Sequence, residues 1–241
     1  GFCAHGCAGV YEAATETNDK YYVDGDKNTD RVYEIANAGQ LYWFAGLVNG
    51  TLADVQQNEK ANAILTADIV VNKNVVDNQG NLIGDGSDFL TWTPIGVDNR
   101  NMFQGNFNGN GHTVSGLYFN DPKAENVGLI GAGKSCTIKN VGVVNSYFGA
   151  VDDIGAILGF NYRKVTILNC FNLNTTIIKH ATTTDGVGGI TGYVSSYSSV
   201  NNCFSTGKVN NAITGAIPVS KVYDSKNNYY LDTSSKKGTF Y

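Results

Sequence analysis

The chain has 241 residues, a formal net charge of −4 at pH 7 and 42% hydrophobic residues. This net negative charge does not indicate a basic surface for binding nucleic acid or an anionic membrane. The sequence also contains no run of about 18 apolar residues that could cross a bilayer. The hydrophobic fraction is sufficient for a continuous core, so one elongated β domain is expected rather than a disordered chain.

The first residues form a short cysteine-containing segment. Cys3 and Cys7 enclose His5. A structural zinc site needs about four ligands in a tetrahedral arrangement, and no second pair of ligands follows, so a local disulfide or a frayed terminus is favoured over zinc. The sequence shows no signal peptide and starts abruptly, which suggests a segment excised from a longer protein.

Next comes a run of alternating oxygen-bearing side chains that resembles the start of a calcium loop. These residues are Asp24, Asp26, Asn28 and Asp30. The run departs from the calcium pattern at Thr29, where a sharp-turn glycine belongs, and at Ile35, where a bidentate glutamate belongs. A solvated acidic turn before a strand at 31–35 is favoured, and calcium stays a weak candidate.

Residues 37–49 have helical periodicity. Asn37 can cap the helix, Gln40 completes a capping box, and Gly50 ends the run. The apolar residues of one face are Leu41, Phe44, Ala45 and Val48. Because a repeat array needs a terminal cap, we expect this helix to cap the first coil, with Tyr42 and Trp43 partly buried. The alternative is an exposed aromatic platform for sugars.

Two segments between this helix and the repeats are predicted strands of the first coils, at residues 63–71 and 91–96. The polar loop 72–88 joins them. Loops of this kind vary without disturbing a stack, so any ligand recognition would vary there.

Five copies of a short pattern follow between residues 105 and 228. The first half of each copy places a glycine among apolar residues at spacings of 23, 27, 33 and 27, namely Gly105, Gly128, Gly155, Gly188 and Gly215. Repeats of this length predict a solenoid. Short β-branched runs broken by Gly, Asn, Ser and Thr exclude helical repeats and predict stacked strands.

The second half of each copy contains a position that holds only Gly or Asn, the residues that enter the left-handed backbone region at least cost. These predicted corners are Gly116, Asn140, Asn169, Asn202 and Asn228. Asparagines stacked coil over coil can form an amide ladder. One residue later an inward row is expected, and alternation along the strand then predicts an outward aromatic row at Tyr118, Phe171, Phe204 and Tyr230.

Cys170 and Cys203 occupy equivalent inward positions of neighbouring coils. A reduced apolar stack is favoured, because buried cysteine behaves as a small hydrophobe, and a disulfide is the alternative. Cys136 begins a strand and is expected to be buried alone.

Parallel β-helices also occur as polysaccharide lyases and hydrolases, so catalysis is the competing interpretation. Glycoside hydrolysis needs two carboxylates across a cleft, about 5 to 9.5 Å apart. Asp152 and Asp153 are adjacent, hence on opposite faces of a strand, and the next acid is Asp185. Arg163 and Lys164 lack the cluster of acids that a lyase would need.

The longest insertion between repeats contains His180 and Asp185. It lengthens one coil without serving the core, so it is a candidate binding loop, although surface insertions in solenoids are usually inert. The outward aromatic row is the stronger candidate, since aligned rings could stack on sugars or on a protein. The alternative is that a long loop covers this row.

The repeats resemble the GLUG motif of secreted bacterial proteins in the segments 103–117, 127–131, 154–159 and 187–192, and residues 33–45 and 65–69 resemble the lead-in of the same proteins. The resemblance covers roughly residues 31–232. It implies a right-handed β-helix from a large surface or secreted protein, often described as adhesin-like. The family includes fragments of IgA-cleaving peptidases, but the motif carries no catalytic residues that could be transferred.

Together these features predict an all-β chain, a single-stranded right-handed parallel β-helix with a short N-terminal capping helix. Residues 1–30 are the predicted extension and 31–241 the β-helix domain, with GLUG-like repeats at 103–232. The expected function is a non-enzymatic, extracellular or cell-surface, adhesin-like module, a monomer without cofactor that binds a glycan or host protein or acts as a rigid spacer. A carbohydrate-active enzyme is the alternative, and it would require at least three polar side chains that converge in a groove.

Overall fold

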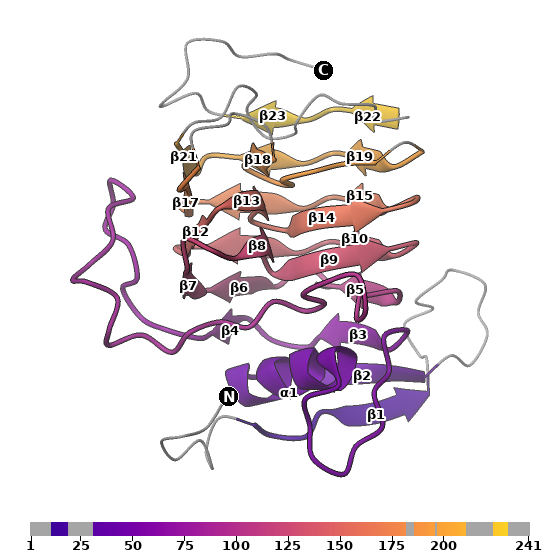
Figure 1. Ribbon diagram of the computed structural model, residues 1–241. Coiled ribbons are helices and arrows are strands. Elements are labelled where there is room, and N and C mark those ends of the chain that lie inside the picture. Colours follow the sequence, from indigo (N-terminus) through magenta and orange to yellow (C-terminus); the bar gives the residue numbers. More distant parts are fainter. Residues whose placement is uncertain (1–10, 19–30, 182–185, 196, 211–223, 231–241) are drawn as a thin grey trace.

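A computed structural model of the chain shows a parallel β-solenoid of about six coils with one short helix. The structure describes residues 11–18, 31–181, 186–195, 197–210 and 224–230. The coils stack along one axis in chain order, from the indigo N-terminal end to the yellow C-terminal end (Figure 1). The predicted fold class is therefore confirmed. The predicted zinc and calcium segments, with Cys3, His5, Cys7 and residues 24–30, lie outside the described residues, as do Asp185 and Gly215.

A complete coil consists of five short strands, each paired in parallel with its equivalents in neighbouring coils. One such coil contains β10 (Thr137–Lys139), β11 (Gly142–Val144), β12 (Tyr147–Ala150), β13 (Asp152–Gly155) and β14 (Leu158–Tyr162). The corresponding five sheets are called sheets 1 to 5 in this order.

The remaining strands belong to these sheets. Sheet 1 contains β1 (Thr15–Asn18), β2 (Arg31–Ile35), β3 (Asn62–Leu65), β5 (Asn106–Asn108), β15 (Thr166–Leu168), β19 (Ser199–Asn201) and β22 (Asp224–Lys226). Sheet 2 contains β4 (Ile69–Val70), β6 (Thr113–Ser115), β16 (Phe171–Leu173), β20 (Phe204–Ser205) and β23 (Tyr229–Tyr230). Sheet 3 contains β7 (Tyr118–Asn120), β17 (Thr176–Lys179) and β21 (Lys208–Val209), sheet 4 contains β8 (Glu125–Val127) and β18 (Val187–Gly188), and sheet 5 contains β9 (Ile130–Lys134).

Left-handed residues bend the chain between these strands. Corner 1, between sheets 1 and 2, has Asn110, Asn140, Asn169, Asn202 and Asn227 with positive φ. Corner 2, between sheets 2 and 3, has Gly116, Asn145 and Asn174. Corner 3, the bend in sheet 4, has Asn126, Asp153 and Gly186. Corner 4, between sheets 5 and 1, has Ser135, Arg163 and Tyr197. Asn and Gly dominate corners 1 and 2 because they adopt this backbone region at least cost.

The predicted amide ladder runs along corner 1. Asn169 Nδ2 donates to Asn140 Oδ1, and Asn202 Nδ2 donates to Asn169 Oδ1, each at 3.0 Å. The ladder extends to Asn108 below, whose Oδ1 accepts from Asn140 at 3.2 Å, and to Asn227 above, which donates to Asn202 at 3.1 Å. Successive coils therefore superimpose as predicted for Asn140, Asn169 and Asn202.

The prediction was wrong for the first and last residues of the predicted corner row, Gly116 and Asn228. Gly116 is left-handed with φ 72°, but it belongs to corner 2 beside Asn145. Left-handed Asn residues recur five residues apart within one coil, as at Asn140 and Asn145, so the sequence pattern aligned Gly116 with Asn140, although Gly116 is in register with Asn145. At the other end Asn227 takes the left-handed conformation, with φ 55°.

Asn228 instead occupies a buried position one residue later, in register with Cys203. Its Oδ1 accepts from the Cys203 N–H at 2.9 Å, and its Nδ2 donates to the Val200 carbonyl at 2.7 Å. The pairing of Phe204 with Tyr229 sets this register. Because Asn227 and Asn228 are adjacent, the sequence alone does not show which of the two is the corner residue.

Helix α1 (Ala38–Asn49) lies at the N-terminal end of the stack, beneath β4 (Figure 1). Asn37 Oδ1 accepts from Gln40 N–H at 2.9 Å, and Gln40 Oε1 accepts from the Ala36 N–H at 2.7 Å rather than from the N–H of the cap residue. Gly50 ends the helix with φ 67°. The predicted apolar residues Leu41, Phe44, Ala45 and Val48 are all buried.

Tyr42 and Trp43 of α1 also face the core region. Trp43 is half-buried, as predicted, whereas Tyr42 is buried more completely than expected. Its hydroxyl donates to the Thr91 carbonyl at 3.0 Å, and its ring packs edge-on against Trp92 with centroids 5.1 Å apart. Burial raises the pKa of Tyr42. The helix therefore closes the core instead of presenting rings to solvent.

The three cysteines in the part of the chain that the structure describes are free and buried in the core, namely Cys136, Cys170 and Cys203. Burial raises the pKa of the Cys170 thiol well above its ordinary value, and it raises that of Cys136 to about 12. Cys170 and Cys203 lie one coil apart at equivalent inward positions, because Phe171 pairs with Phe204. They fill the core as small apolar side chains.

Candidate functional site

Two of the four predicted outward aromatic residues lie together on the outer face of sheet 2. The rings of Phe171 and Phe204 stack with centroids 5.1 Å apart and an interplanar angle of 3°. Tyr229 is in register with Phe204 one coil further and is 58% exposed. We call Phe171, Phe204 and Tyr229 the ring strip. Tyr230, the predicted fourth member, is one residue beyond the register position, and its side chain lies outside the described residues.

The ring strip rests on small or polar neighbours in the coils below it. Gly142 pairs with Phe171, and a methyl group at Gly142 would overlap the Phe171 ring. Leu173, on the same face of β16, is also exposed. The strip and its neighbour thus form an apolar surface on a backbone that is hydrogen-bonded coil to coil.

Tyr118 is not part of this surface, which corrects the sequence prediction. It lies on the outer face of sheet 3, where its ring stacks on Tyr147 with centroids 5.9 Å apart. Its ring also packs on Phe89 at 5.4 Å, and Val75 and Val76 complete the cluster. The slip between corners 1 and 2 explains the wrong assignment. For Tyr118 the alternative prediction holds, because a long loop covers it.

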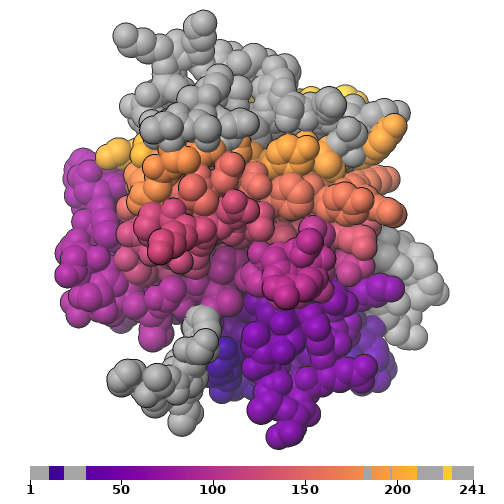
Figure 2. Space-filling model, viewed as in Figure 1, coloured from indigo at the N-terminus to yellow at the C-terminus, as the bar shows by residue number. Residues whose placement is uncertain are grey.

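That loop is the predicted polar segment 72–88, and it folds along the outside of sheet 3. Figure 2 shows it in magenta, as a ridge along the left flank of the later coils. Thr176 Oγ1 donates to the Gly80 carbonyl, and Asn174 Nδ2 donates to the Asp77 carbonyl. These bonds fix a loop from an early coil onto strands about 100 residues later.

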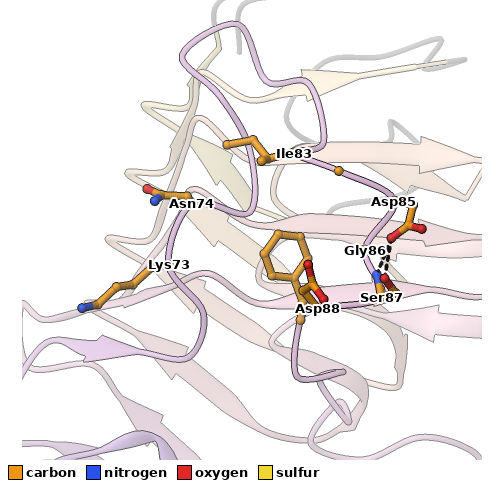
Figure 3. A pocket seen from close by; sticks show the side chains of 9 residues that line it. Lys73, Asn74, Ile83, Asp85, Gly86, Ser87 and Asp88 are labelled. Atoms are coloured by element: carbon orange, nitrogen blue, oxygen red, sulfur yellow. Dashed lines mark hydrogen bonds between the residues drawn. The ribbon is translucent and has the colours of Figure 1, made fainter.

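A hollow of about 520 Å³ lies within this loop (Figure 3), lined by Lys73, Asn74, Ile83, Gly84, Asp85, Gly86, Ser87, Asp88 and Phe89. Asp85 Oδ1 accepts from the Ser87 hydroxyl at 2.6 Å and from its N–H at 2.9 Å. These hydrogen bonds hold the pKa of Asp85 below its ordinary value. In Figure 3 Lys73 and Asp85 lie at opposite ends of the hollow, so its charged groups do not converge.

The acidic residues weighed for catalysis have structural partners. Asp152 Oδ1 lies 2.6 Å from Lys179 Nζ, and the Lys179 side chain is 0% exposed. Asp153 is the left-handed residue of the bend in sheet 4. Since the ammonium is fully enclosed, it serves to neutralise Asp152 at this bend and is not accessible to a substrate.

The remaining candidates are divided between other parts of the coil. His180 follows β17 and is exposed, with Nε2 2.9 Å from Asn120 Oδ1. Another histidine, His112, lies beside corner 1, with Nδ1 3.5 Å from Asp68 Oδ1. Arg163 and Lys164 lie in corner 4, on a different edge. Among the described residues, these side chains do not form the convergent polar group that an enzyme would require.

The structure also shows an aromatic surface that sequence reasoning missed, beside corner 4. Phe160 and Tyr193 stack with centroids 5.2 Å apart, and Arg163 Cζ lies 5.6 Å from the centre of the Tyr162 ring. Tyr197, in the same corner one coil further, is 70% exposed. We call these five residues the aromatic corner. The spacing of 33 residues from Phe160 to Tyr193 equals the repeat length there and could have revealed it.

No known family model matches the chain. A curated relative from Evansella cellulosilytica, named "Putative Gly-rich membrane protein", is 34% identical over 110 residues, which make up 37% of this chain and 13% of the relative. Another, "Halomucin" from Haloquadratum walsbyi, is 29% identical over 124 residues, which make up 47% of this chain and 1% of the relative. The chain therefore spans only a small part of the length of either relative.

Among solved structures, one described as "a putative immunoglobulin A1 protease" from Bacteroides ovatus is similar with a TM-score of 0.39 and 15% identity, covering 96% of this chain and 81% of the other. Similarity at this level carries no argument about activity. In the described part of the chain, no helix has the length and apolar character needed to span a bilayer.

Proposed function

We propose that this chain is a non-enzymatic, extracellular surface module that uses a rigid β-solenoid to present a binding surface for a glycan or a host protein. The observation that carries the proposal is the ring strip, in which Phe171, Phe204 and Tyr229 are aligned one per coil on the outer face of sheet 2. Aromatic side chains of this kind dominate recognition surfaces because they offer large contact area at low entropic cost.

The solenoid supports this role because it holds the strip in one arrangement. Each strand of sheet 2 is paired on both sides between β6 and β20, and the amide ladder of corner 1 borders the strip. A preorganised surface loses little conformational freedom on binding, which favours affinity. The module acts as a monomer and needs no cofactor.

The names of the two relatives, a membrane protein and a halomucin, support an extracellular or cell-surface location. The resemblance of the repeats to GLUG-motif proteins is part of the same proposal, and it extends it to an adhesin-like role. A catalytic role finds less support, because Lys179 is enclosed and Asp152 is paired with it.

The test is a binding screen of the purified chain on a glycan array and on immobilised host surface proteins, repeated with Phe171→Ala and Phe204→Ala. Residues at the centre of an interface typically cost about 2 kcal/mol or more when truncated, so binding should weaken roughly thirtyfold. Ile83→Ala, an exposed apolar residue in the loop over sheet 3, is the matched control and should leave binding unchanged. Absence of any binding by the unaltered chain would leave only the spacer interpretation.

A further inference from the structure

Corner 4 departs from the backbone rule that corners 1 and 2 obey. In the described parts of corners 1 and 2, every left-handed residue is Asn or Gly. In corner 4 the left-handed residues are Ser135, Arg163 and Tyr197, with φ values of 51°, 66° and 69°. For residues as large as Arg163 and Tyr197, the left-handed backbone conformation costs roughly 1 to 2 kcal/mol. Because Arg163 and Tyr197 are exposed, burial in the core does not offset this conformational cost.

A buried polar cluster holds these two strained turns in place. The Asn161 side chain is 0% exposed. Its Nδ2 donates to the Arg163 carbonyl at 2.6 Å and to Ser198 Oγ at 2.9 Å, while its Oδ1 accepts from the Ser195 N–H at 2.7 Å. Ser198 Oγ in turn accepts from the Val165 N–H at 3.1 Å. One enclosed amide therefore ties together the turns that carry Arg163 and Tyr197, and it fixes the surface above them.

The surface combines aromatic rings, hydroxyl groups and positive charge. Tyr162, Tyr193 and Tyr197 are exposed, and the phenols of Tyr162 and Tyr193 can donate or accept hydrogen bonds. Lys134 pairs with Tyr162 one coil below, and Lys164 follows Arg163 in the corner. Among the described residues, no ion pair joins Arg163, Lys164 or Lys134 to a carboxylate. In a chain of net charge −4, this is a local concentration of unneutralised cations.

These features fit an acidic sugar better than other partners. The apolar face of a pyranose ring can stack on an aromatic side chain, its hydroxyls can bond to phenols, and a uronate carboxylate can take a bidentate arginine contact. Nucleic acid is disfavoured, because its binding depends on many phosphate contacts and on a broad basic surface, and only three cations are gathered here.

We propose that the aromatic corner binds a uronic-acid polysaccharide, with Arg163 engaging the carboxylate and Tyr162 and Tyr193 stacking on the sugar rings. This inference rests on the proposed function and deepens it, since it names the ligand class and places a second binding surface on a different edge from the ring strip. The strained turn at Arg163 is then explained by the contact that its side chain makes with the ligand.

The decisive variant is Arg163→Asn, because Asn suits the left-handed backbone. Its thermal midpoint should equal or exceed that of the unaltered chain, while its affinity for polygalacturonate oligomers, measured by calorimetry, should fall at least tenfold. Tyr162→Ala and Tyr193→Ala should weaken binding to a similar degree. Arg163→Lys keeps the charge but loses the bidentate contact, so it should retain part of the affinity. Fully methyl-esterified oligomers should bind the unaltered chain at least tenfold more weakly than the free acids.

Three results would overturn the inference: equal affinity of Arg163→Asn and the unaltered chain, equal affinity for free and esterified oligomers, or no binding of polygalacturonate. If the chain binds other array ligands through Phe171 and Phe204 and is indifferent to Arg163→Asn, the inference fails while the proposed function stands. If no ligand binds at either surface, both fail. Tyr229→Ala, on the ring strip, is the control and should not change uronate binding.

Discussion

Replacement of Asn169 tests whether the amide ladder and the left-handed corner stabilise the stack. Asn169 is the central member of the ladder, with one hydrogen bond to Asn140 and one from Asn202, and its φ is 54°. Asn169→Gly removes the amide but keeps a residue suited to this backbone. Asn169→Ala removes the amide and also places a Cβ in the left-handed region.

The expected magnitudes follow from these two contributions. The two ladder bonds are exposed, so water can replace them, and each contributes only about 0.5 to 1 kcal/mol. Asn169→Gly should therefore lower the free energy of unfolding by about 1 to 2 kcal/mol. For Asn169→Ala the left-handed backbone adds roughly 1 kcal/mol, which gives about 2 to 3 kcal/mol in total.

Guanidinium-induced unfolding, followed by far-UV circular dichroism and by tryptophan fluorescence, measures both values. Coincidence of the two unfolding curves shows that the stack unfolds in one step, which is required for deriving a free energy of unfolding from them. Asn78→Ala, an exposed asparagine in the loop over sheet 3, is the control and should change stability by less than about 0.5 kcal/mol. A larger cost for Asn169→Gly than for Asn169→Ala would refute the argument about the corner, and a negligible cost for both would refute the ladder.

Two further predictions concern buried groups. Asp152→Asn removes the carboxylate that lies 2.6 Å from the enclosed Lys179 ammonium, so the free energy of unfolding should fall by roughly 2 to 4 kcal/mol. This is somewhat below the usual cost of breaking a buried pair, because Asp152 is partly exposed. Adding Lys179→Met to the same variant should restore part of the loss, and no recovery would contradict this reasoning. The pKa of Cys136 is raised to about 12 by burial, so the folded state retains its proton while an unfolded thiol ionises near pH 8.5. Stability from this group should be complete below that pH and decline as the pH rises toward 12. Unfolding curves measured from pH 8 to 11 should be less steeply pH-dependent in Cys136→Ala than in the unaltered chain, and equal pH dependence would count against the prediction.

The parts of the fold that were predictable depend on local backbone signals. Asn37, Gln40 and Gly50 mark the ends of α1 through side-chain and backbone geometry that needs no tertiary information. Likewise, Asn140, Asn169 and Asn202 stand at the same position of three successive repeats, and the left-handed preference of Asn marks them as corners. Strand β2 begins at Arg31 and ends at Ile35, as predicted.

The assignments that failed depend on telling one corner of a coil from the next. Most strands here are only two to four residues long, and a left-handed residue at corner 1 is followed by another five residues later at corner 2, as at Asn140 and Asn145. Gly116 and Tyr118 were therefore assigned to the corner and the sheet before their own. Hydrophobic alternation cannot detect such a shift, because a strand of three residues is too short to establish a period. The coverage of Tyr118 by the loop 72–88 is a contact between distant segments, which no local pattern reports.

The aromatic corner was missed for a different reason: repeats in the sequence report the scaffold and not the surface that the scaffold carries. Repeats in the sequence reveal positions that hold the same type of residue in each coil, such as Asn at corner 1. A binding surface needs side chains chosen for a ligand, so it breaks the repeat where it occurs. Arg163 and Tyr197 break it at a corner, and the enclosed Asn161 compensates with hydrogen bonds to the turns on either side. In a solenoid whose corners 1 and 2 follow one rule, the proposed binding surface lies at the corner that departs from it, where a buried polar side chain holds the two strained turns in place.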